Sequence, residues 1–475
     1  MRRSQPFILA IPKGIIDQLN KVLESERPDF NYRKEYFYYL INYLIVKDII
    51  NSKKKYHAIN KKKLKSITTK MIGRYVKYLH THGLIESDSK YISGIKSYHY
   101  KLNKKYLYGT SFVEINNSNK IYDRMVKKSR LRNKNVNRLA PHLKAMQKEF
   151  MNLDLDYDSA YKWIDEQEKK AHLITSILML QDKRLRYFKR NKTNNRLDTN
   201  ITNLKSNLRQ FFLGNYISID LKNSQPFFLM MLIKGMIKHT QREYYHIPNV
   251  DTFMFHTLFK YIDKQIIDKV SKIPQNALFE QNEELLNLEN AILKGEFYDN
   301  LQSTFDLPRK EVKKMMFEIL FSRNLIDNRF IPFKKNKKIF ASKYPLFARI
   351  IKTLKSKKYK NLAIYLQSIE SYIFIDLISA ELVSAGIIPL TIHDSIIIES
   401  KDYNQAIKIV ENVFKTRFGV IPTFHIKPLK NKSMKKLEKR FPEMIRITKK
   451  KQNRKTHKYY LQSDSNSTLR KINQL

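Results

Sequence analysis

Apolar positions near the N-terminus fall into three runs that predict helices. Residues 36–50 are apolar at most positions, as in a buried helix, and residues 61–66 fit a short second helix. In the third run the apolar side chains recur at i, i+3, i+4 and i+7, and they are Ile72, Tyr75, Val76 and Leu79. Thr68 or Thr69 can cap this helix at its start, and Gly83 can end it.

A strand-like alternation follows the third helix. Residues 97–102 alternate, and with Tyr91, Ile92 and Gly94 they predict a hairpin. Three helices followed by a two-stranded wing are typical of a winged-helix DNA-binding domain, which we assign to residues 35–106. The third helix carries cations away from its apolar face, namely Lys70, Arg74 and Lys77. We expect these cations to contact DNA, and ordinary solvated charge is the alternative.

The rest of the chain divides into four parts. Residues 107–140 are basic and poorly patterned, which favours a linker, and residues 141–210 are mainly helical. Residues 211–430 mix short strands with helices, and residues 431–475 have the composition of a basic flexible tail. A chain of this length with these patterns predicts an α+β protein of more than one domain.

The net charge of the chain indicates what kind of molecule it would bind. The 475 residues include 91 Lys and Arg against 44 Asp and Glu, a formal net charge of +47. Such a surface attracts polyphosphate and binds it in a salt-dependent way. Drift in an AT-rich coding sequence, which favours Lys, Asn, Ile and Tyr, is the alternative. Drift alone would not remove half of the balancing acids, so the charge favours nucleic-acid binding.

Several classes of protein are excluded by what the sequence lacks. Without Cys there are no disulfides and no thiolate zinc site. The longest apolar run, residues 226–233, is too short to span a bilayer, and the N-terminus has no signal-peptide pattern. We therefore expect a soluble cytoplasmic protein with no membrane partner. A phosphate-binding Gly-x4-Gly-Lys loop is also missing, which argues against an ATP-driven helicase.

The first segment with candidate chemistry is Tyr216-Ile-Ser-Ile-Asp220-Leu-Lys-Asn-Ser-Gln225-Pro. It predicts a short strand that ends in a carboxylate, followed by a turn and the apolar residues 227–233. An acid at a strand end lies at a sheet edge, where active sites form. Alone, an Asp in this position before a helix is more often a helix N-cap.

The second segment is a helix that begins at Pro308. Arg309, Lys313, Phe317 and Phe321 recur every four residues, so they form one slowly drifting stripe on a helix. The cations lie at the positive end of this helix, which suits a triphosphate, and the aromatic rings lie further along, where sugar and base would meet them. An amphipathic helix with core aromatics is the alternative.

The third segment runs from Gly386 to Glu399. Two apolar strands flank His393-Asp394-Ser395, which predicts a β-hairpin with Asp394 at its tip. A carboxylate among buried strands is costly unless it binds a metal or accepts hydrogen bonds. A simple turn residue is one alternative, and a phosphohydrolase metal dyad is another. The dyad would need further His ligands that the sequence lacks.

Taken in order, these three segments resemble motifs A, B and C of the family A DNA polymerases and the single-subunit phage RNA polymerases. The second segment has the fingers-helix residues Arg, Lys, Phe and Tyr-or-Phe at every fourth position, and the third has the His-Asp pair. Upstream, Asn195-Arg196-Leu197 is similar to the Gly-Arg-Leu segment that precedes motif A. The resemblance covers about residues 190–430 and is closest to polymerase-like proteins of plasmids, phages and mobile elements. It implies a right-hand polymerase, with palm and fingers in residues 211–430 and a helical thumb in residues 141–210.

The resemblance also implies how catalysis would work. Asp220, Asp394 and the backbone carbonyl of Leu221 would hold two Mg²⁺ ions, with Mn²⁺ as an alternative. Lys313 would face the α-phosphate and protonate the leaving pyrophosphate.

Further residues would contact the substrates, which the resemblance implies are nucleoside triphosphates and a DNA template and primer. Arg309 would hold the outer phosphates, and Phe317 would pack on the incoming sugar and base. His393, Arg196 and Gln367 would contact the primer and template.

Departures from the family pattern bear on sugar choice. Family A DNA polymerases carry Asp-Tyr-Ser-Gln-x-Glu at motif A, and here Gln225 aligns with the Glu that excludes ribose. His-Asp-Ser in place of His-Asp-Glu favours the RNA polymerases. Phe321, however, lacks the hydroxyl with which a Tyr would recognise a ribose 2′-OH. We therefore expect nucleotide binding by Phe321 and Gln225 that prefers dNTPs, with weaker rejection of rNTPs than a Glu would give.

Two alternative functions fit parts of the same sequence. A single-subunit RNA polymerase or primase would have the same motifs with the opposite sugar preference. A replication initiator that binds DNA without polymerising would share the basic surface and the winged helix. Intact Asp220, Lys313 and Asp394 argue against the initiator.

Overall fold

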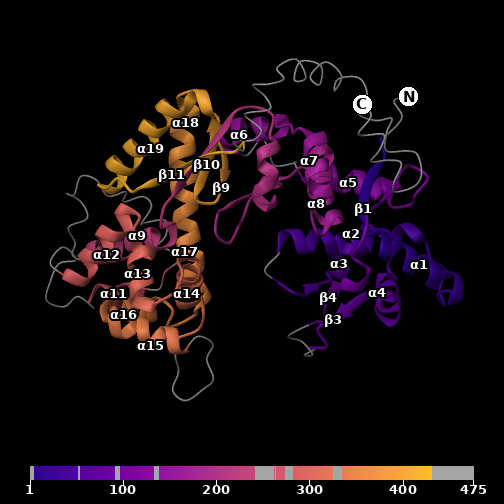
Figure 1. The fold of residues 1–475 in the computed structure, drawn as a ribbon, viewed down its shortest axis with the longest axis horizontal. Helices are drawn as coiled ribbons and strands as arrows, with labels where there is room; N and C mark the ends of the chain where they lie inside the picture. Colours follow the sequence, from indigo (N-terminus) through magenta and orange to yellow (C-terminus); the bar gives the residue numbers. More distant parts are fainter. Residues whose placement is uncertain are drawn as a thin grey trace.

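The computed structural model describes residues 5–51, 54–90, 97–132, 139–240, 262, 264–272, 282–324 and 334–430. Over these residues many helices combine with small antiparallel sheets, which confirms the expected α+β class. The chain forms an arch (Figure 1), in which residues 7–132 make one lobe and residues 264–354 make the other. In Figure 1 the strands between residues 390 and 428 lie above the second lobe, on the same limb of the arch. The predicted tail, residues 431–475, lies outside the described residues.

The N-terminal lobe is built from helices and two small sheets around one apolar core. Its elements are β1 (Phe7–Ile11), α1 (Lys13–Ser25), α2 (Lys34–Ile50), β2 (His57–Ala58), α3 (Lys61–Lys65), α4 (Ile72–Thr81), β3 (Ile85–Ser87), β4 (His99–Leu102), β5 (Ser111–Ile115) and α5 (Tyr122–Arg132). One sheet has the order β2-β4-β3, and the other pairs β1 with β5.

The helices expected in residues 35–106 are present as α2, α3 and α4, and α4 ends just before Gly83, whose φ is +69°. Strand β4 coincides with the predicted alternation. On one side β4 pairs with β3, with Ile85 opposite Leu102. The hairpin therefore begins earlier in the chain than the sequence indicated. The expected first strand at Tyr91 and Ile92 lies outside the described residues. The order of elements is thus helix, strand, helix, helix, strand, strand.

Residues 107–140 were predicted as a linker, and that prediction is wrong for most of the segment. Strand β5 pairs with β1 along its whole length, from Phe7 opposite Ile115 to Ile11 opposite Ser111. Ile115 and Tyr122 are buried in the core of the N-terminal lobe. The short apolar pattern gave no sign of this pairing because the partner strand lies far away in the sequence.

Residues 141–210 are helical at first and then form a small hairpin. The elements are α6 (Pro141–Asn152), α7 (Tyr157–Asp165), α8 (Lys170–Gln181), β6 (Phe188–Arg190) and β7 (Leu197–Thr199). Their apolar core extends to Ala10 of the N-terminal lobe and to Ile392 of the central sheet. Arg186 is fully buried here and donates to the carbonyls of Leu180, Phe150 and Met151 at 2.6, 2.9 and 3.0 Å. One guanidinium therefore caps the C-terminal ends of both α6 and α8.

A four-stranded antiparallel sheet forms the centre of the second half. Its strands are β8 (Tyr216–Leu221), β9 (Leu390–Ile392), β10 (Ser395–Glu399) and β11 (Phe424–Pro428), in the order β11-β8-β10-β9. The other helices of this half pack around the sheet or form the second lobe: α9 (Ser224–Thr240), α11 (Lys264–Ser271), α12 (Glu283–Lys294), α13 (Phe297–Phe305), α14 (Arg309–Phe321), α15 (Lys334–Lys343), α16 (Pro345–Leu354), α17 (Lys360–Ser371), α18 (Ser379–Ser384) and α19 (Tyr403–Phe418). One large core joins the lobe to the sheet.

Helices α17 and α18 are continuous through a π-helical segment, Tyr372–Ile378. By length and composition, the combined stretch Lys360–Ser384 could cross a membrane. The apolar run at residues 226–233 is too short to do so. Within the protein, 61% of its most apolar window is buried, as in a core helix. A π-helical turn is frequent near functional sites, and this one begins two residues after the buried Glu370.

Candidate active site

Strand β8, an inner strand of the central sheet, carries Asp220 near its C-terminal end. The side chain of Asp220 accepts a hydrogen bond from the Ser218 hydroxyl at 2.6 Å, and Ser218 also contacts the Ser395 hydroxyl at 2.7 Å. Ser395 lies directly opposite Asp220 in the β8–β10 register, and His425 lies opposite on the β11 side. Asp220 is thus flanked on both sides by strands. It belongs to a strand that continues to Leu221, so it is not a helix N-cap.

Asp394 lies in the two-residue turn between β9 and β10, at the tip of the hairpin that the sequence predicted. The preceding residue, His393, has φ +55°, a left-handed conformation that such a tight hairpin requires. The backbone N–H of Leu221 donates to the carbonyl of Asp394 at 3.1 Å. The structure therefore brings Asp220 and Asp394 together on neighbouring antiparallel strands.

The surroundings of this pair disfavour two ionised carboxylates. Burial raises the pKa of Asp394 above its ordinary value, and the negative charge of Asp220 raises it further. A hydrogen bond from Ser224 and the positive charge of Lys313 act in the opposite direction. Two adjacent carboxylates with oxygen donors match the preference of Mg²⁺ for hard ligands. Across the described part of the chain there is no group of three or more His, Cys, Asp or Glu side chains arranged to hold a metal ion. Backbone oxygen and water would have to complete the ligand set.

Helix α14 carries the predicted stripe. Arg309 and Lys313 are exposed, and Phe317 and Phe321 are half-buried and stacked, with ring centroids 5.7 Å apart. The influence of Lys313 on the pKa of Asp394 places the cation near the acidic pair. Arg309 forms an ion pair with Asp299 at 2.7 Å.

Tyr298 of α13 connects this helix to the acidic pair. The side chains of Arg309 and Lys313 lie 5.8 and 6.0 Å from the centre of its ring. Burial raises the pKa of the Tyr298 phenol, and the charge of Asp394 raises it further while Arg309 opposes. The tyrosine therefore stays neutral between the cations and the carboxylate.

A second acidic group lies beside the pair. Glu370 of α17 is 1% exposed and accepts hydrogen bonds from Arg196 at 2.6 Å and from Gln225 at 3.3 Å. Burial raises the pKa of Glu370 to about 7, Arg196 and Gln225 oppose this rise, and the charge of Asp394 adds to it. Gln367, one turn earlier, accepts from Asn194 at 2.7 Å. Arg196, Gln225 and Gln367 thus come together although they are far apart in the sequence.

Non-glycine residues with left-handed backbone cluster around these segments. Asn195 precedes Arg196, Asn223 forms the turn between β8 and α9, and His393 precedes Asp394, with φ of 55, 53 and 55°. Such conformations cost on the order of 1 kcal/mol each and persist where the surrounding structure imposes them. Asn and His adopt this conformation more readily than most side chains, which suits them to these three tight turns.

The three cations predicted to contact DNA lie in the other lobe. Lys70 and Lys77 are exposed on and beside α4, as the apolar stripe indicated. Arg74 is also exposed, but it pairs with Asp29 at 2.9 Å and lies 5.2 Å from the ring centre of Phe30. Lys70 and Lys77, in contrast, have no ion pair or aromatic contact among the described residues.

Sequence reasoning did not assign functions to three residues that the structure places at the site. These residues are Tyr298, Glu370 and Arg209, and Arg209 is half-buried near Asp220. Burial lowers the pKa of Arg209, and the charge of Asp220 opposes this effect. Glu370 is the one acid in the mostly apolar residues 362–375, and that was the available signal for it.

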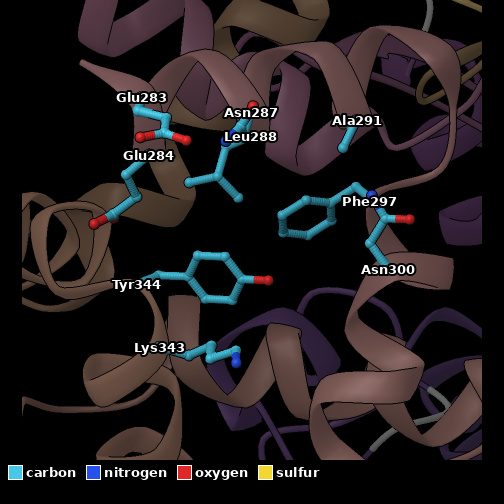
Figure 2. A pocket seen from close by; sticks show the side chains of 9 residues that line it. All are labelled: Glu283, Glu284, Asn287, Leu288, Ala291, Phe297, Asn300, Lys343 and Tyr344. Atoms are coloured by element: carbon cyan, nitrogen blue, oxygen red, sulfur yellow. The ribbon is translucent and has the colours of Figure 1, made fainter.

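A separate cavity of about 380 Å³ lies between α12, α13 and the α15–α16 junction. The rings of Phe297 and Tyr344 face it from opposite sides, with Glu283, Asn287 and Lys343 at its rim (Figure 2). None of the predicted catalytic residues lines it. Glu284, which also borders the cavity, accepts hydrogen bonds from the backbone N–H groups of Leu346 and Phe347, so it caps α16.

Comparison with known proteins identifies no family for this chain. No protein-family model and no curated protein matches the sequence. Among solved structures, one similar chain is the POL domain of Pol1 from M. smegmatis in complex with DNA primer-template and dNTP, at 12% identity and a TM-score of 0.22. The match covers 57% of this chain and 55% of that one, so it spans about half of the M. smegmatis chain. A likeness of this size does not identify a fold.

Proposed function

We propose that this protein is a template-directed nucleotidyltransferase that extends a DNA primer by two-metal phosphoryl transfer, as a DNA polymerase does. The observation that supports this proposal best is the juxtaposition of Asp220 and Asp394 on adjacent antiparallel strands, with Lys313 close by. Phosphoryl transfer needs positioning and neutralisation of charge more than covalent chemistry, and this arrangement offers both.

Asp220, Asp394 and the carbonyl of Leu221 would hold two divalent cations, Mg²⁺ by the chemistry of their oxygen donors. When bound, these ions activate the primer 3′-hydroxyl and neutralise the triphosphate. Lys313 would bind near the α-phosphate and donate a proton to the leaving pyrophosphate. Arg309, at the N-terminal end of α14, would leave Asp299 and hold the outer phosphates.

The aromatic part of the stripe would recognise sugar and base. Phe317 would pack against the incoming nucleotide, and Phe321 with Gln225 would limit the space at the 2′ position. We propose that the enzyme prefers dNTPs on this basis, because Phe321 offers no hydroxyl to a ribose. Shrinking Gln225 to Ala should then admit rNTPs more readily.

The N-terminal lobe would recruit duplex DNA. The order of elements and the exposed Lys70 and Lys77 support a winged-helix contact, with α4 facing the groove. His393, Arg196 and Gln367 would contact the primer and template near the catalytic pair. Removal of the N-terminal contacts should weaken template recruitment more than extension of a primer that is already bound.

Primer extension with dNTPs and with rNTPs, each with and without a primer, tests the proposal. We expect primer-dependent incorporation of dNTPs that Asp220→Ala and Asp394→Ala each abolish, with DNA binding nearly intact because the basic surface supplies it. Glu399→Gln serves as the control, since Glu399 lies at the exposed far end of β10.

Each of the other outcomes would indicate a different function or a wrong assignment of the catalytic pair. A preference for rNTPs would indicate an RNA polymerase or primase. DNA binding without incorporation would indicate an initiator. Normal extension by Asp220→Ala would refute the assignment of the catalytic pair.

A further inference from the structure

The cluster around Glu370 joins three segments that are distant in the sequence. Glu370 comes from α17, Arg196 from the β6–β7 hairpin, and Gln225 from the first turn of α9, directly after the turn that follows Asp220. Both donors bond to the same oxygen, Oε2, at 2.6 and 3.3 Å. One carboxylate oxygen therefore accepts from both a guanidinium and an amide.

The cluster is also left with unused hydrogen-bonding groups. Over the described residues, Oε1 of Glu370 and Nε of Arg196 have no partner, although both atoms are buried. An arginine and a carboxylate usually pair through two parallel bonds, and here they pair through one. A buried ion pair seldom stabilises a fold more than apolar side chains would, so stability alone does not explain this arrangement.

We propose that Glu370 is a positioning residue that sets the orientation of Arg196 toward the primer and of Gln225 toward the incoming sugar. The inference rests on the proposed function, because it assigns Glu370 a role in that same site. Held by Oε2, the guanidinium of Arg196 keeps its Nε free, and the amide of Gln225 is fixed beside the turn that carries Asp220 to α9. A change at Glu370 should thus affect primer binding and sugar choice together.

Loss of the Glu370 acceptor should have a measurable effect. A hydrogen bond to a charged group such as the Arg196 guanidinium is worth about a tenfold change in affinity, or about 1.4 kcal/mol. Glu370→Met removes the acceptor but keeps the length of the side chain. We expect the KM for primer to rise about tenfold and the ratio of dNTP to rNTP efficiency to fall by a similar factor. Glu370→Gln keeps an acceptor oxygen and should retain most of both properties.

Double-mutant cycles separate positioning from general damage. If Glu370 acts through Gln225, then Glu370→Met combined with Gln225→Ala should have the sugar ratio of Gln225→Ala alone. If it acts through Arg196, then Glu370→Met combined with Arg196→Ala should have the primer KM of Arg196→Ala alone.

Glu289→Met is the matched control. Glu289 is also a buried glutamate, paired with Lys234 at 2.7 Å in the same half of the molecule. Its loss should lower the amount of active protein without changing the primer KM or the sugar ratio.

The outcomes distinguish this inference from the proposed function. Absence of incorporation by the wild-type protein would remove the proposed function, and the inference with it. Incorporation by the wild type, with Glu370→Met and Glu370→Gln both giving wild-type primer KM and sugar ratio, would overturn the inference alone. Single-variant effects that multiply in the double variants would also overturn it.

Discussion

Replacement of Asp220 by Asn should stabilise the central sheet in the absence of divalent ions while it abolishes activity. The pKa of Asp394 is raised by burial and then by the charge of Asp220. A carboxyl whose pKa is raised by folding binds protons more tightly in the folded state. Its contribution to stability therefore falls as pH rises from the unfolded pKa toward the folded one, and at neutral pH the ionised pair costs stability. Asn at position 220 removes the repulsion and keeps the side-chain shape.

The size of the effect follows from the spacing of the strands. Neighbouring strands lie about 5 Å apart, and two charges at that distance repel by roughly 3 kcal/mol at an effective dielectric constant of about 20. Asp220 is partly exposed and Lys313 lies nearby, so screening lowers the gain to about 1 kcal/mol. Because about 1.4 kcal/mol is a factor of ten, amide exchange in β8 and β10 should slow about fivefold in EDTA.

Magnesium should reverse the order of stability. An ion at ten times its dissociation constant stabilises the wild type by about 1.4 kcal/mol, and the variant lacks the site. The assay is hydrogen exchange of residues 216–221 and 395–399 with EDTA and with Mg²⁺, with Glu399→Gln as the charge-matched control. Faster exchange of Asp220→Asn in EDTA, or full protection of the variant by Mg²⁺, would refute the reasoning that these carboxylates share a cation.

Three further predictions concern other parts of the molecule. Burial lowers the pKa of Lys355 to about 8. Between that value and the ordinary pKa of lysine, the unfolded chain binds more protons than the folded protein. The free energy of unfolding of the wild type should therefore rise with pH by up to about 3 kcal/mol, and urea titrations should show no such rise in Lys355→Met. Arg186→Met should lower the free energy of unfolding by about 3–5 kcal/mol, because three carbonyls at helix ends lose their donor. Limited proteolysis within residues 141–210 should be faster in the variant, and unchanged resistance to the protease would contradict the prediction. Lys70→Ala with Lys77→Ala should reduce the slope of log affinity against log salt by up to about 2 for duplex DNA, and an unchanged slope would place the DNA elsewhere.

The sequence by itself predicted the elements that depend on near neighbours. A four-residue repeat from Arg309 to Phe321 requires a helix, and that helix runs over those residues in the structure. Apolar runs bounded by turn residues predicted the strand before Asp220 and the hairpin at Asp394. Helical periodicity and turn chemistry act over a few residues, so they can be read without knowledge of the fold.

The tertiary structure alone decided which of these elements meet. Pairing of β5 with β1 turned an expected linker into part of the N-terminal lobe, and the pairing of β3 with β4 shifted the predicted hairpin. The ion pair of Glu370 with Arg196 joins residues 174 positions apart, and no local pattern marks it. Such contacts depend on how whole helices and strands pack, and a buried charge is tolerated only where packing brings it a partner. For that reason the sequence predicted Asp220 and Asp394, whereas the acidic group that supports their neighbours emerged only from the fold.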